Sequence, residues 1–445
     1  MSYIANTAAQ QQQMLAACGV SDIAELFKDI PADLAPRSWN LPQGKSEFEV
    51  LSKLQKLAAQ NYTHLLNFVG GGFYDHFIPS AVDALASRSE FFTAYTPYQP
   101  ELSQGTLQAM YEYQSHICRL TDLHCSNASV YDGGTALYEA CQMAISQTGR
   151  RKIIMDGGVN PIYRKMIRSY TANLTIEFCE IPVSHGQSDR AKLFAALDDT
   201  TAAVILQNPN FFGVMDDHTD IAARCREQGI LSIQSVYPVA LALLKTPGAM
   251  GIDIATGEGQ SLGIALSFGG PYLGFMAARK ELIRKMPGRI SGKTVDAQGR
   301  TGYVLTLQAR EQHIRREKAT SNICSNQALC ALRAHLYLSL LGKEGLKEVA
   351  ALCHSKSEYA KERLSAIAGV EIMRTNATFN EFTVRLPMDA GECVGRMIER
   401  GIVPGFPLGR YYSGMEQYLL VAVTEKRTKY EIGQLAENLE AVLCN

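Results

Sequence analysis

The sequence has almost no net charge and no long apolar run. Its 43 basic residues are balanced by 44 acidic residues, so the formal net charge is −1. No basic excess indicates nucleic-acid binding. No stretch approaches the roughly 18 uninterrupted apolar residues that a membrane span requires. The first residues, MSYIANTAAQQQQML, lack the basic and apolar regions of a signal or transit peptide. We therefore expect a cytoplasmic protein that binds neither nucleic acid nor membranes.

Cysteine pairs with a metal-binding spacing are also missing. The eleven cysteines include no C-x-x-C pair, and an odd number in a long chain is not typical of a disulfide framework. Two histidines and two cysteines lie close together, but their spacing is not that of a structural zinc site. These residues are His116, Cys118, His124 and Cys125. We expect free thiols and no bound metal.

What the sequence does contain is a long alternation of apolar and amphipathic segments. From about residue 128, short runs that are apolar throughout alternate with helical segments near 160–170, 188–197 and 217–228. Strands of this kind form a mostly parallel sheet that is covered on both faces, so we predict an α/β fold. The predicted strands are ASVY (128–131), KIIMD (152–156), TIEFCEI (175–181), AAVILQNP (202–209), ILSIQS (230–235) and IDIATGE (252–258).

Three regions are predicted along the chain. Residues 1–65 form a helical N-terminal arm, and residues 66–320 form a large α/β domain. Residues 321–445 form a linking helix followed by a small C-terminal α/β domain. Within the arm, helical periodicity follows the possible cap Ser21-Asp22 and returns at residues 46–61.

Two local features separate the large domain from the small one. A hairpin is predicted around residues 296–300, after which the alternation of strands and helices stops. The linking helix is predicted to begin at a cap formed by Thr320-Ser321-Asn322 and to end at Gly342.

The turn Gly133-Gly134-Thr135 is the first candidate site. It leads from a predicted strand into a predicted helix. Free backbone N–H groups and the positive end of a helix can bind a phosphate at such a turn. A tight strand-to-helix turn also uses glycine for its backbone alone, so the turn by itself leaves both interpretations open.

The order of elements resembles the large pyridoxal-phosphate enzymes of the aspartate-aminotransferase fold. In that fold a lysine after a late strand binds the cofactor covalently, and a carboxylate on an earlier strand keeps the pyridine nitrogen protonated. Counting back from Gly270-Pro271 places Gln260 at the lysine position, and residues 231–244 contain neither Asp nor Glu. A neutral amide cannot form an imine. We therefore expect no cofactor held covalently by this chain, and the turn at Gly133 becomes a vestigial phosphate turn.

Long motifs make the resemblance specific. They are similar to the N-terminal half of the glycine cleavage P-protein, glycine decarboxylase, over essentially the whole chain. In many bacteria that half is a separate α subunit, whose β partner carries the lysine. The motifs are GGGFYDHFIP (70–79), AYTPYQPELSQG (94–105), QNPNFFGVMDD (207–217) and the long segment 286–329.

The resemblance implies an activity and partners. Glycine would be decarboxylated with pyridoxal phosphate held by the β subunit, and the aminomethyl group would pass to the lipoyl arm of H-protein. The two subunits are expected to form an α2β2 tetramer. The chain would then belong to an oxidoreductase without anchoring the cofactor itself.

Two exposed-looking segments are candidates for contacts with substrate or partners. The first, stiffened by two prolines, suits a dimer interface or an active-site wall, although a buried structural loop is equally compatible. It contains Tyr95, Tyr98, Gln99 and Glu101. The second could bind an anion, H-protein or the β subunit, or form a solvated run paired internally with Glu311 and Glu317. It contains Arg310, His313, Arg315 and Arg316. Tyr74-Asp75-His76 suggests an acid/base pair, with a structural hydrogen-bonded pair as the alternative.

Three other functions compete with this interpretation. Gly259 to Gly263 fits the G-x-S-x-G elbow of hydrolases around Ser261, but the glycine turn at Gly269 leaves no room for the helix that must follow. A stand-alone pyridoxal enzyme could use Lys245 or Lys280, although neither is at the usual place. The chain could also be a non-catalytic scaffold or regulator with the same fold.

Overall fold

The computed structural model describes residues 5–31, 33–34, 38, 40–324, 327–373 and 376–444. The chain separates into two compact units, residues 1–63 and residues 64–445. The first unit contains α1 (Ala8–Ala17), the 3-10 helix η1 (Ile23–Phe27) and α2 (Glu47–Ala58). A capping box starts each of them. None of the three contains a buried residue, so the described residues of this unit form no core of their own.

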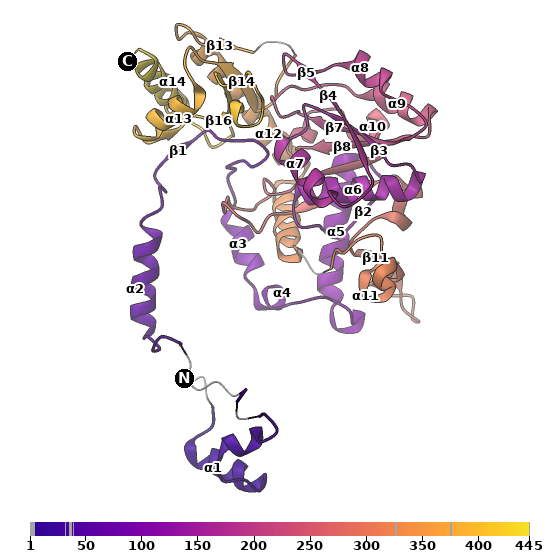
Figure 1. Ribbon diagram of the computed structural model, residues 1–445, viewed down its shortest axis with the longest axis vertical. Helices are drawn as coiled ribbons and strands as arrows, with labels where there is room; N and C mark the ends of the chain where they lie inside the picture. Colours follow the sequence, from indigo (N-terminus) through magenta and orange to yellow (C-terminus); the bar gives the residue numbers. More distant parts are fainter. Residues whose placement is uncertain are drawn as a thin grey trace. The chain divides into compact units, whose positions relative to one another are not determined.

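A seven-stranded sheet organises the second unit (Figure 1). Its strand order is β2-β10-β9-β8-β7-β3-β4. The five strands from β9 to β4 pair in parallel, and β10 is antiparallel to both of its neighbours. The prediction of a mostly parallel sheet is therefore confirmed. The strands are β2 (Cys125–Ser126), β3 (Lys152–Asp156), β4 (Glu177–Ile181), β7 (Thr201–Asn208), β8 (Leu231–Val236), β9 (Ile254–Glu258) and β10 (Gly274–Ala278).

Alternate residues of the parallel strands enter two different cores, because neighbouring side chains point to opposite faces. On β3, Ile153 and Met155 pack with α6 and α7, whereas Ile154 packs with α8 and α9. Helices thus cover both faces, as predicted. The helices along this part of the chain are α3 (Ser80–Ala86), α4 (Ser89–Phe92), α5 (Gln104–Thr121), α6 (Gly133–Thr148), α7 (Pro161–Tyr170), α8 (Arg190–Ala195), α9 (Thr219–Glu227) and α10 (Pro247–Met250).

The predicted strand at 128–131 is wrong. The chain pairs in the sheet earlier, through β2, and Val130 forms only an isolated bridge with Gly274. The segment is nevertheless buried, because Ala128 and Val130 are 5% and 0% exposed. Its apolar character indicates burial there rather than a full strand.

The hairpin is confirmed, but the predicted start of the linking helix is wrong. The strands β11 (Ile290–Val295) and β12 (Thr301–Thr306) flank the predicted turn. Helix α12 (Ala328–Ser365) begins after Gln327, which makes no side-chain cap. The Ser321 hydroxyl instead accepts from the N–H of Ile323 in a local turn, so it does not cap the helix. At Gly342 the helical geometry is interrupted (φ 60°, ψ −169°), near the predicted end of the first helical part.

The C-terminal region forms a smaller sheet packed against helices. Its four antiparallel strands have the order β13-β14-β17-β16. Phe382, Leu419 and Leu435 lie in the core that this sheet shares with α12, α13 and α14. The elements are β13 (Glu371–Ile372), β14 (Glu381–Arg385), α13 (Ala390–Ile398), β15 (Ile402–Val403), β16 (Phe406–Pro407), β17 (Tyr418–Ala422) and α14 (Lys429–Leu443).

The chain that follows the first unit is joined to this C-terminal region. Strand β1 (Leu66–Asn67) pairs in parallel with β15. The segment that follows, residues 70–79, contacts both sheets through Tyr74, which hydrogen-bonds to Gln260 beyond β9 and to Glu381 on β14. Within the described residues, no helix combines the length and apolar character that crossing a membrane requires.

Candidate functional site

Gln260 lies just beyond the end of β9, at the predicted lysine position, and is 1% exposed. Its Oε1 accepts from the backbone N–H of Tyr74 at 2.9 Å. Its Nε2 donates to the carbonyls of Tyr74 and Ile264 at 3.0 and 2.8 Å. Both ends of the amide are therefore used to hold backbone. Gln260 is a structural clamp on the segment 70–79.

The predicted vestigial phosphate turn does begin a helix. α6 starts at Gly133, and the Asp132 carboxylate accepts from the N–H of Thr135 at 2.8 Å. A Cβ at Gly133 would lie 2.9 Å from the backbone nitrogen of Glu258, so this close approach requires glycine.

The N–H group of Gly133 is already bonded within the chain. It donates to Glu258 Oε2 at 2.9 Å. The other carboxylate oxygen, Oε1, accepts from the N–H groups of Gln260 and Leu273 at 2.9 and 3.0 Å. We call this arrangement of Gly133, Gln260 and Leu273 N–H groups around Glu258 the anion cup. Burial raises the pKa of Glu258 to about 8, against the lowering effect of the three N–H donors.

A small pocket opens beside the anion cup. Strand β8 presents Ser235 to this pocket, and no carboxylate lies on β8. Together with the amide of Gln260 and the occupied cup, this lining does not fit covalently held pyridoxal phosphate. The pocket is lined by Gly72, Tyr74, Asn160, Tyr163, Gln207, Pro209, Ser235, Val236, Tyr237 and Glu258.

A second buried carboxylate holds the glycine-rich segment. Glu381 accepts from the N–H of Gly71 at 2.6 Å and from the hydroxyl of Tyr74 at 2.7 Å. A Cβ at Gly70 would lie 1.9 Å from Glu381 Oε1, which explains the glycine there. Burial raises the pKa of Glu381 to about 7. β14 therefore fixes the same segment that Gln260 clamps from β9.

The side chains of Tyr74, Asp75 and His76 form no hydrogen bond with one another. Tyr74 bonds Glu381, whereas Asp75 pairs with Lys426 and Arg427 at 2.6 and 3.0 Å. The acid/base interpretation of this triplet therefore has no geometric support, and the structural alternative describes all three.

His76 lies instead in a cluster that sequence reasoning missed. Its Nδ1 is 2.6 Å from Glu425, and its Nε2 contacts the hydroxyl of Tyr237. The thiol of Cys353 donates to the same Glu425 carboxylate at 3.4 Å. The atoms of His76, Cys353 and Glu425 that could bind a metal lie within 4.8 Å of one another, but each already has a hydrogen-bond partner.

The four residues considered for a metal in the sequence do not form such a cluster among the described residues. His116 instead faces His335, with ring centroids 5.3 Å apart. Burial and the neighbouring His335 lower the pKa of His116 to about 4. Burial raises the pKa of both thiols, Cys118 to about 12 and Cys125 to about 11.

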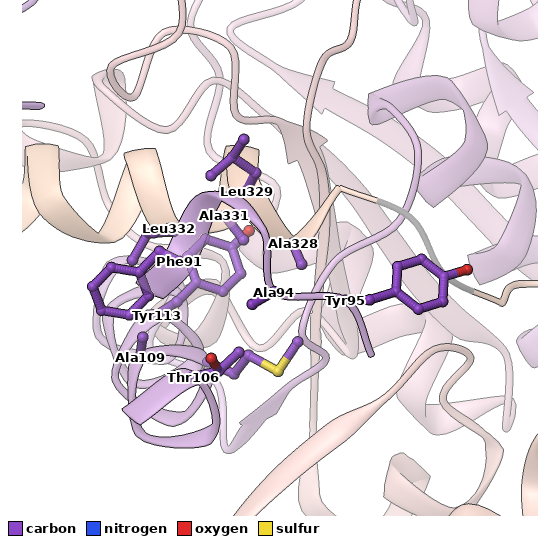
Figure 2. Close-up of a pocket in the computed structure, with 11 residues that line it drawn as sticks. Phe91, Ala94, Tyr95, Thr106, Ala109, Tyr113, Ala328, Leu329, Ala331 and Leu332 are labelled. Carbon is purple, nitrogen blue, oxygen red and sulfur yellow. The ribbon is translucent and has the colours of Figure 1, made fainter. Parts of the chain in front are cut away.

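The loop 95–101 is exposed, so the buried-loop alternative is wrong. Tyr95 and Tyr98 are 79% and 46% exposed, and Gln99 and Glu101 are exposed as well. Phe91 and Tyr113 line an apolar pocket beside the loop, where α5 and the start of α12 meet (Figure 2). The Tyr95 ring extends away from those two rings (Figure 2).

The structure joins the two candidate segments through Tyr98. Arg289 donates to the Tyr98 hydroxyl at 3.1 Å, and its guanidinium lies over the Tyr98 ring. His313 packs edge-on against the same ring, at 5.8 Å between centroids. Arg289 was missed in the sequence, and no pattern there indicated this contact.

The basic segment has both structural and exposed members. Arg310 donates to the carbonyls of Leu307 and Gly288 at 3.1 and 3.0 Å, so it has a structural role. Arg315 and Arg316 are exposed, and neither forms an ion pair with a described residue. Glu311 is buried and faces Arg289 and His313 rather than these two arginines. Internal pairing therefore does not neutralise Arg315 and Arg316.

The residues of the competing functions are placed elsewhere. Lys245 pairs with Asp217 at 3.1 Å, and Lys280 begins a 3-10 helix after β10, so neither lines the pocket beside the cup. Ser261 is buried, and the chain at Ser261–Gly263 forms a turn instead of a helix. The hydrolase elbow is therefore ruled out.

The fold defines a domain of the pyridoxal-phosphate fold-type I class, with Gln260 at the position predicted for the lysine. Two solved enzymes of this class share the fold at low identity. Sphingosine-1-phosphate lyase of Burkholderia pseudomallei matches with a TM-score of 0.66 and 14% identity, over 92% of this chain and 93% of its own. Glutamate decarboxylase of Lactobacillus brevis matches with a TM-score of 0.69 and 12% identity, over 95% and 97%.

A family model described as "Glycine cleavage system P-protein" matches residues 1–439. The chain is 58% and 57% identical to proteins named "Probable glycine dehydrogenase (decarboxylating) subunit 1" from Nitratidesulfovibrio vulgaris (strain DSM 19637 / Miyazaki F) and Maridesulfovibrio salexigens, over the full length of each chain. A crystal structure of glycine decarboxylase (P-protein) in inhibitor-bound form matches with a TM-score of 0.94 and 40% identity over both full chains. The chain belongs to the glycine cleavage system P-protein family.

Proposed function

We propose that this chain is the α subunit of a two-subunit glycine decarboxylase. The complete enzyme removes the carboxyl group of glycine and transfers the aminomethyl group to the lipoyl arm of H-protein. The single observation that carries the proposal is the 58% identity, over full length, to a protein named as subunit 1 of this enzyme. The name subunit 1 implies a second subunit.

Pyridoxal phosphate is proposed to reside on that second, β subunit. Support comes from Gln260, because both the oxygen and the nitrogen of its side-chain amide are hydrogen-bonded to the backbone of Tyr74 and Ile264. Further support comes from the occupied anion cup and from β8, which has no carboxylate. When bound to β, the cofactor supplies the electron sink for loss of the carboxyl group. This chain contributes shape, positioning and exclusion of water.

The exposed apolar residues around loop 95–101 are proposed as the contact surface for β, in an α2β2 assembly. Phe92, Tyr95 and Leu102 are 62%, 79% and 79% exposed. Aromatic and apolar side chains at this density are typical of the buried centre of an interface. Tyr98 fixes the base of the surface through Arg289 and His313, so the loop is held in place before assembly.

Arg315 and Arg316 are proposed to attract an acidic face of H-protein. They are exposed and are not neutralised by a described acidic neighbour. Because solvent screens exposed charges, these arginines should mainly raise the rate at which H-protein associates with the enzyme. That rate should fall as the salt concentration rises.

Reconstitution with the β subunit and lipoylated H-protein tests the proposal. The measurement is glycine-dependent exchange of labelled bicarbonate by α alone, by β alone and by the mixture. We expect exchange only in the mixture, together with a complex that contains both chains. Equal exchange by β alone would favour the scaffold or regulatory function instead. Exchange by α alone would contradict the absence of a cofactor site in this chain.

A further inference from the structure

Three backbone N–H groups converge on one side chain in the anion cup. Helix α6 has 16 residues, and its first N–H, from Gly133, donates to Glu258 at 2.9 Å. Gln260 and Leu273 add N–H groups from the chain on either side of the turn after β9. A helix N-terminus with convergent N–H groups is the arrangement that binds phosphate groups in proteins. Here a carboxylate of the chain itself is bound in it.

The contact between Glu258 and the cup is built by the fold. Glu258 is 6% exposed and lies at the end of β9, two residues before Gln260. Gly133 admits it because a Cβ there would come within 2.9 Å of the Glu258 backbone and 2.8 Å of the Tyr163 hydroxyl. The Asp132 carboxylate, which accepts from Thr135, lies at the same helix end. A phosphate dianion brought to the intact cup would therefore find its three N–H donors bonded to Glu258 and the Asp132 carboxylate beside them.

We propose that the Glu258 carboxyl group takes the place of a phosphate group and excludes phosphate monoesters from this chain. Removing its carboxylate would leave three buried N–H donors without a partner and would create a site for inorganic phosphate or a phosphate monoester. Glu258 also lines the pocket beside the cup, so removing its side chain would open the cup toward that pocket. The inference extends the proposed absence of a cofactor from this chain, but its test needs neither the β subunit nor activity.

The test compares the native full-length chain with the variants Glu258→Ala and Glu258→Gln. Glu258→Ala empties the cup, whereas Glu258→Gln keeps it filled by a side chain of the same shape. The probes are inorganic phosphate and pyridoxine 5′-phosphate, which lacks an aldehyde and so cannot form imines with surface lysines. Pyridoxine without the phosphate is the control ligand. Binding is measured by calorimetry, and the unfolding midpoint is measured in phosphate and in chloride at equal ionic strength.

We expect Glu258→Ala to bind both phosphate probes at least about tenfold more tightly than the native chain does, because an anion restores the lost hydrogen bonds. Phosphate at about 50 mM should raise the unfolding midpoint of Glu258→Ala by several degrees and leave the native chain and Glu258→Gln nearly unchanged. Pyridoxine should bind none of the three proteins.

Two results would overturn the inference. One is native phosphate binding as tight as that of Glu258→Ala, and the other is no phosphate effect on the folded Ala variant. If Glu258→Ala does not fold in chloride, its refolding yield in phosphate becomes the readout. Rescue by phosphate supports the inference, and equal failure in both salts overturns it. Neither outcome bears on reconstitution with β, so failure here is distinguishable from failure of the proposed function.

Discussion

The amide of Gln260 is bonded twice to the backbone of Tyr74, a residue 186 positions away in the chain. Oε1 accepts from its N–H at 2.9 Å, and Nε2 donates to its carbonyl at 3.0 Å. The position where a lysine would bind a cofactor in this fold is therefore used to hold the glycine-rich segment 70–79 against the large sheet. Gln260 therefore has a structural role at this position.

This clamp predicts the behaviour of Gln260→Lys. The lysine would leave the Tyr74 N–H unpaired and would bury an ammonium, so we expect a loss of about 2–5 kcal/mol in the free energy of unfolding. No glycine-dependent bicarbonate exchange should appear without β, because the pocket has no acidic partner on β8. Urea unfolding and the exchange assay are the measurements. Gln260→Met, which removes the amide without adding charge, is the control, and exchange by the Lys variant alone would contradict the proposal.

Buried carboxyl groups predict a dependence of stability on pH. Burial raises the pKa of Glu139 to about 7, against a lowering contribution from Ser321. A carboxyl with a raised folded-state pKa contributes stability that is fully present below its unfolded pKa, near 4.5, and that is lost as the pH rises through 7. Glu381 and Glu258, with pKa values of about 7 and about 8, act in the same direction. We therefore expect the free energy of unfolding to fall between pH 5 and pH 8.

The variant Glu139→Gln isolates one of these groups. We compare the free energy of unfolding of the variant with that of the native chain at each pH. This difference should shift in favour of the variant by on the order of 2 kcal/mol between pH 5 and pH 8. Denaturant unfolding at the two pH values measures the difference. Glu227→Gln alters a carboxylate that is 67% exposed and should change nothing. An identical pH slope in Glu139→Gln and the native chain would show that Glu139 is ionised in the folded protein.

The architecture was predictable because buried strands are enriched in apolar residues over short stretches of sequence. The segments at 152–156 and 252–258 are rich in apolar residues and buried at every position, and they contain the interior strands β3 and β9. The place of Gln260 just beyond a buried strand could also be predicted, by counting back from Gly270-Pro271. The segment at 128–131 shows the limit of this reasoning, since it is buried without forming a full strand.

The contacts of the candidate site were not predictable in the same way. Glu258 meets Gly133 across 125 residues, and Glu381 meets Gly71 across 310. Periodicity tells which positions are buried, but it does not tell which two buried polar groups meet. Glu258 stands at the carboxyl end of a predicted parallel strand, where ligand sites in such sheets lie. That position indicated Glu258 as a candidate site residue. The start of α12 was misplaced because Ser321 forms a local turn instead of a helix cap.

The exposed loop predicts an effect on assembly without an effect on folding. Tyr95→Ala and Leu102→Ala each alter a side chain that is 79% exposed, so the free energy of unfolding should change by less than about 0.5 kcal/mol. If these residues lie at the centre of the contact with β, each substitution should weaken assembly by about tenfold or more. Complex mass as a function of concentration is the measurement. Tyr430→Ala, 74% exposed on α14, is the matched control, and unchanged assembly in both loop variants would exclude this surface.

Charge reversal at Arg315 or Arg316 predicts a defect in the use of H-protein. Both side chains are exposed and lack a described acidic partner, so reversal should leave unfolding nearly unchanged. The KM for H-protein in the reconstituted enzyme should rise by several fold for Arg315→Glu and Arg316→Glu. Added salt should raise the KM of the native enzyme toward that of the variants, because the added ions screen the attraction. Arg363→Glu, which alters an exposed arginine on α12 that also has no ion pair with a described residue, is the matched control. If both reversals left the KM, its salt dependence and the mass of the complex unchanged, this basic segment would have no part in binding H-protein or β.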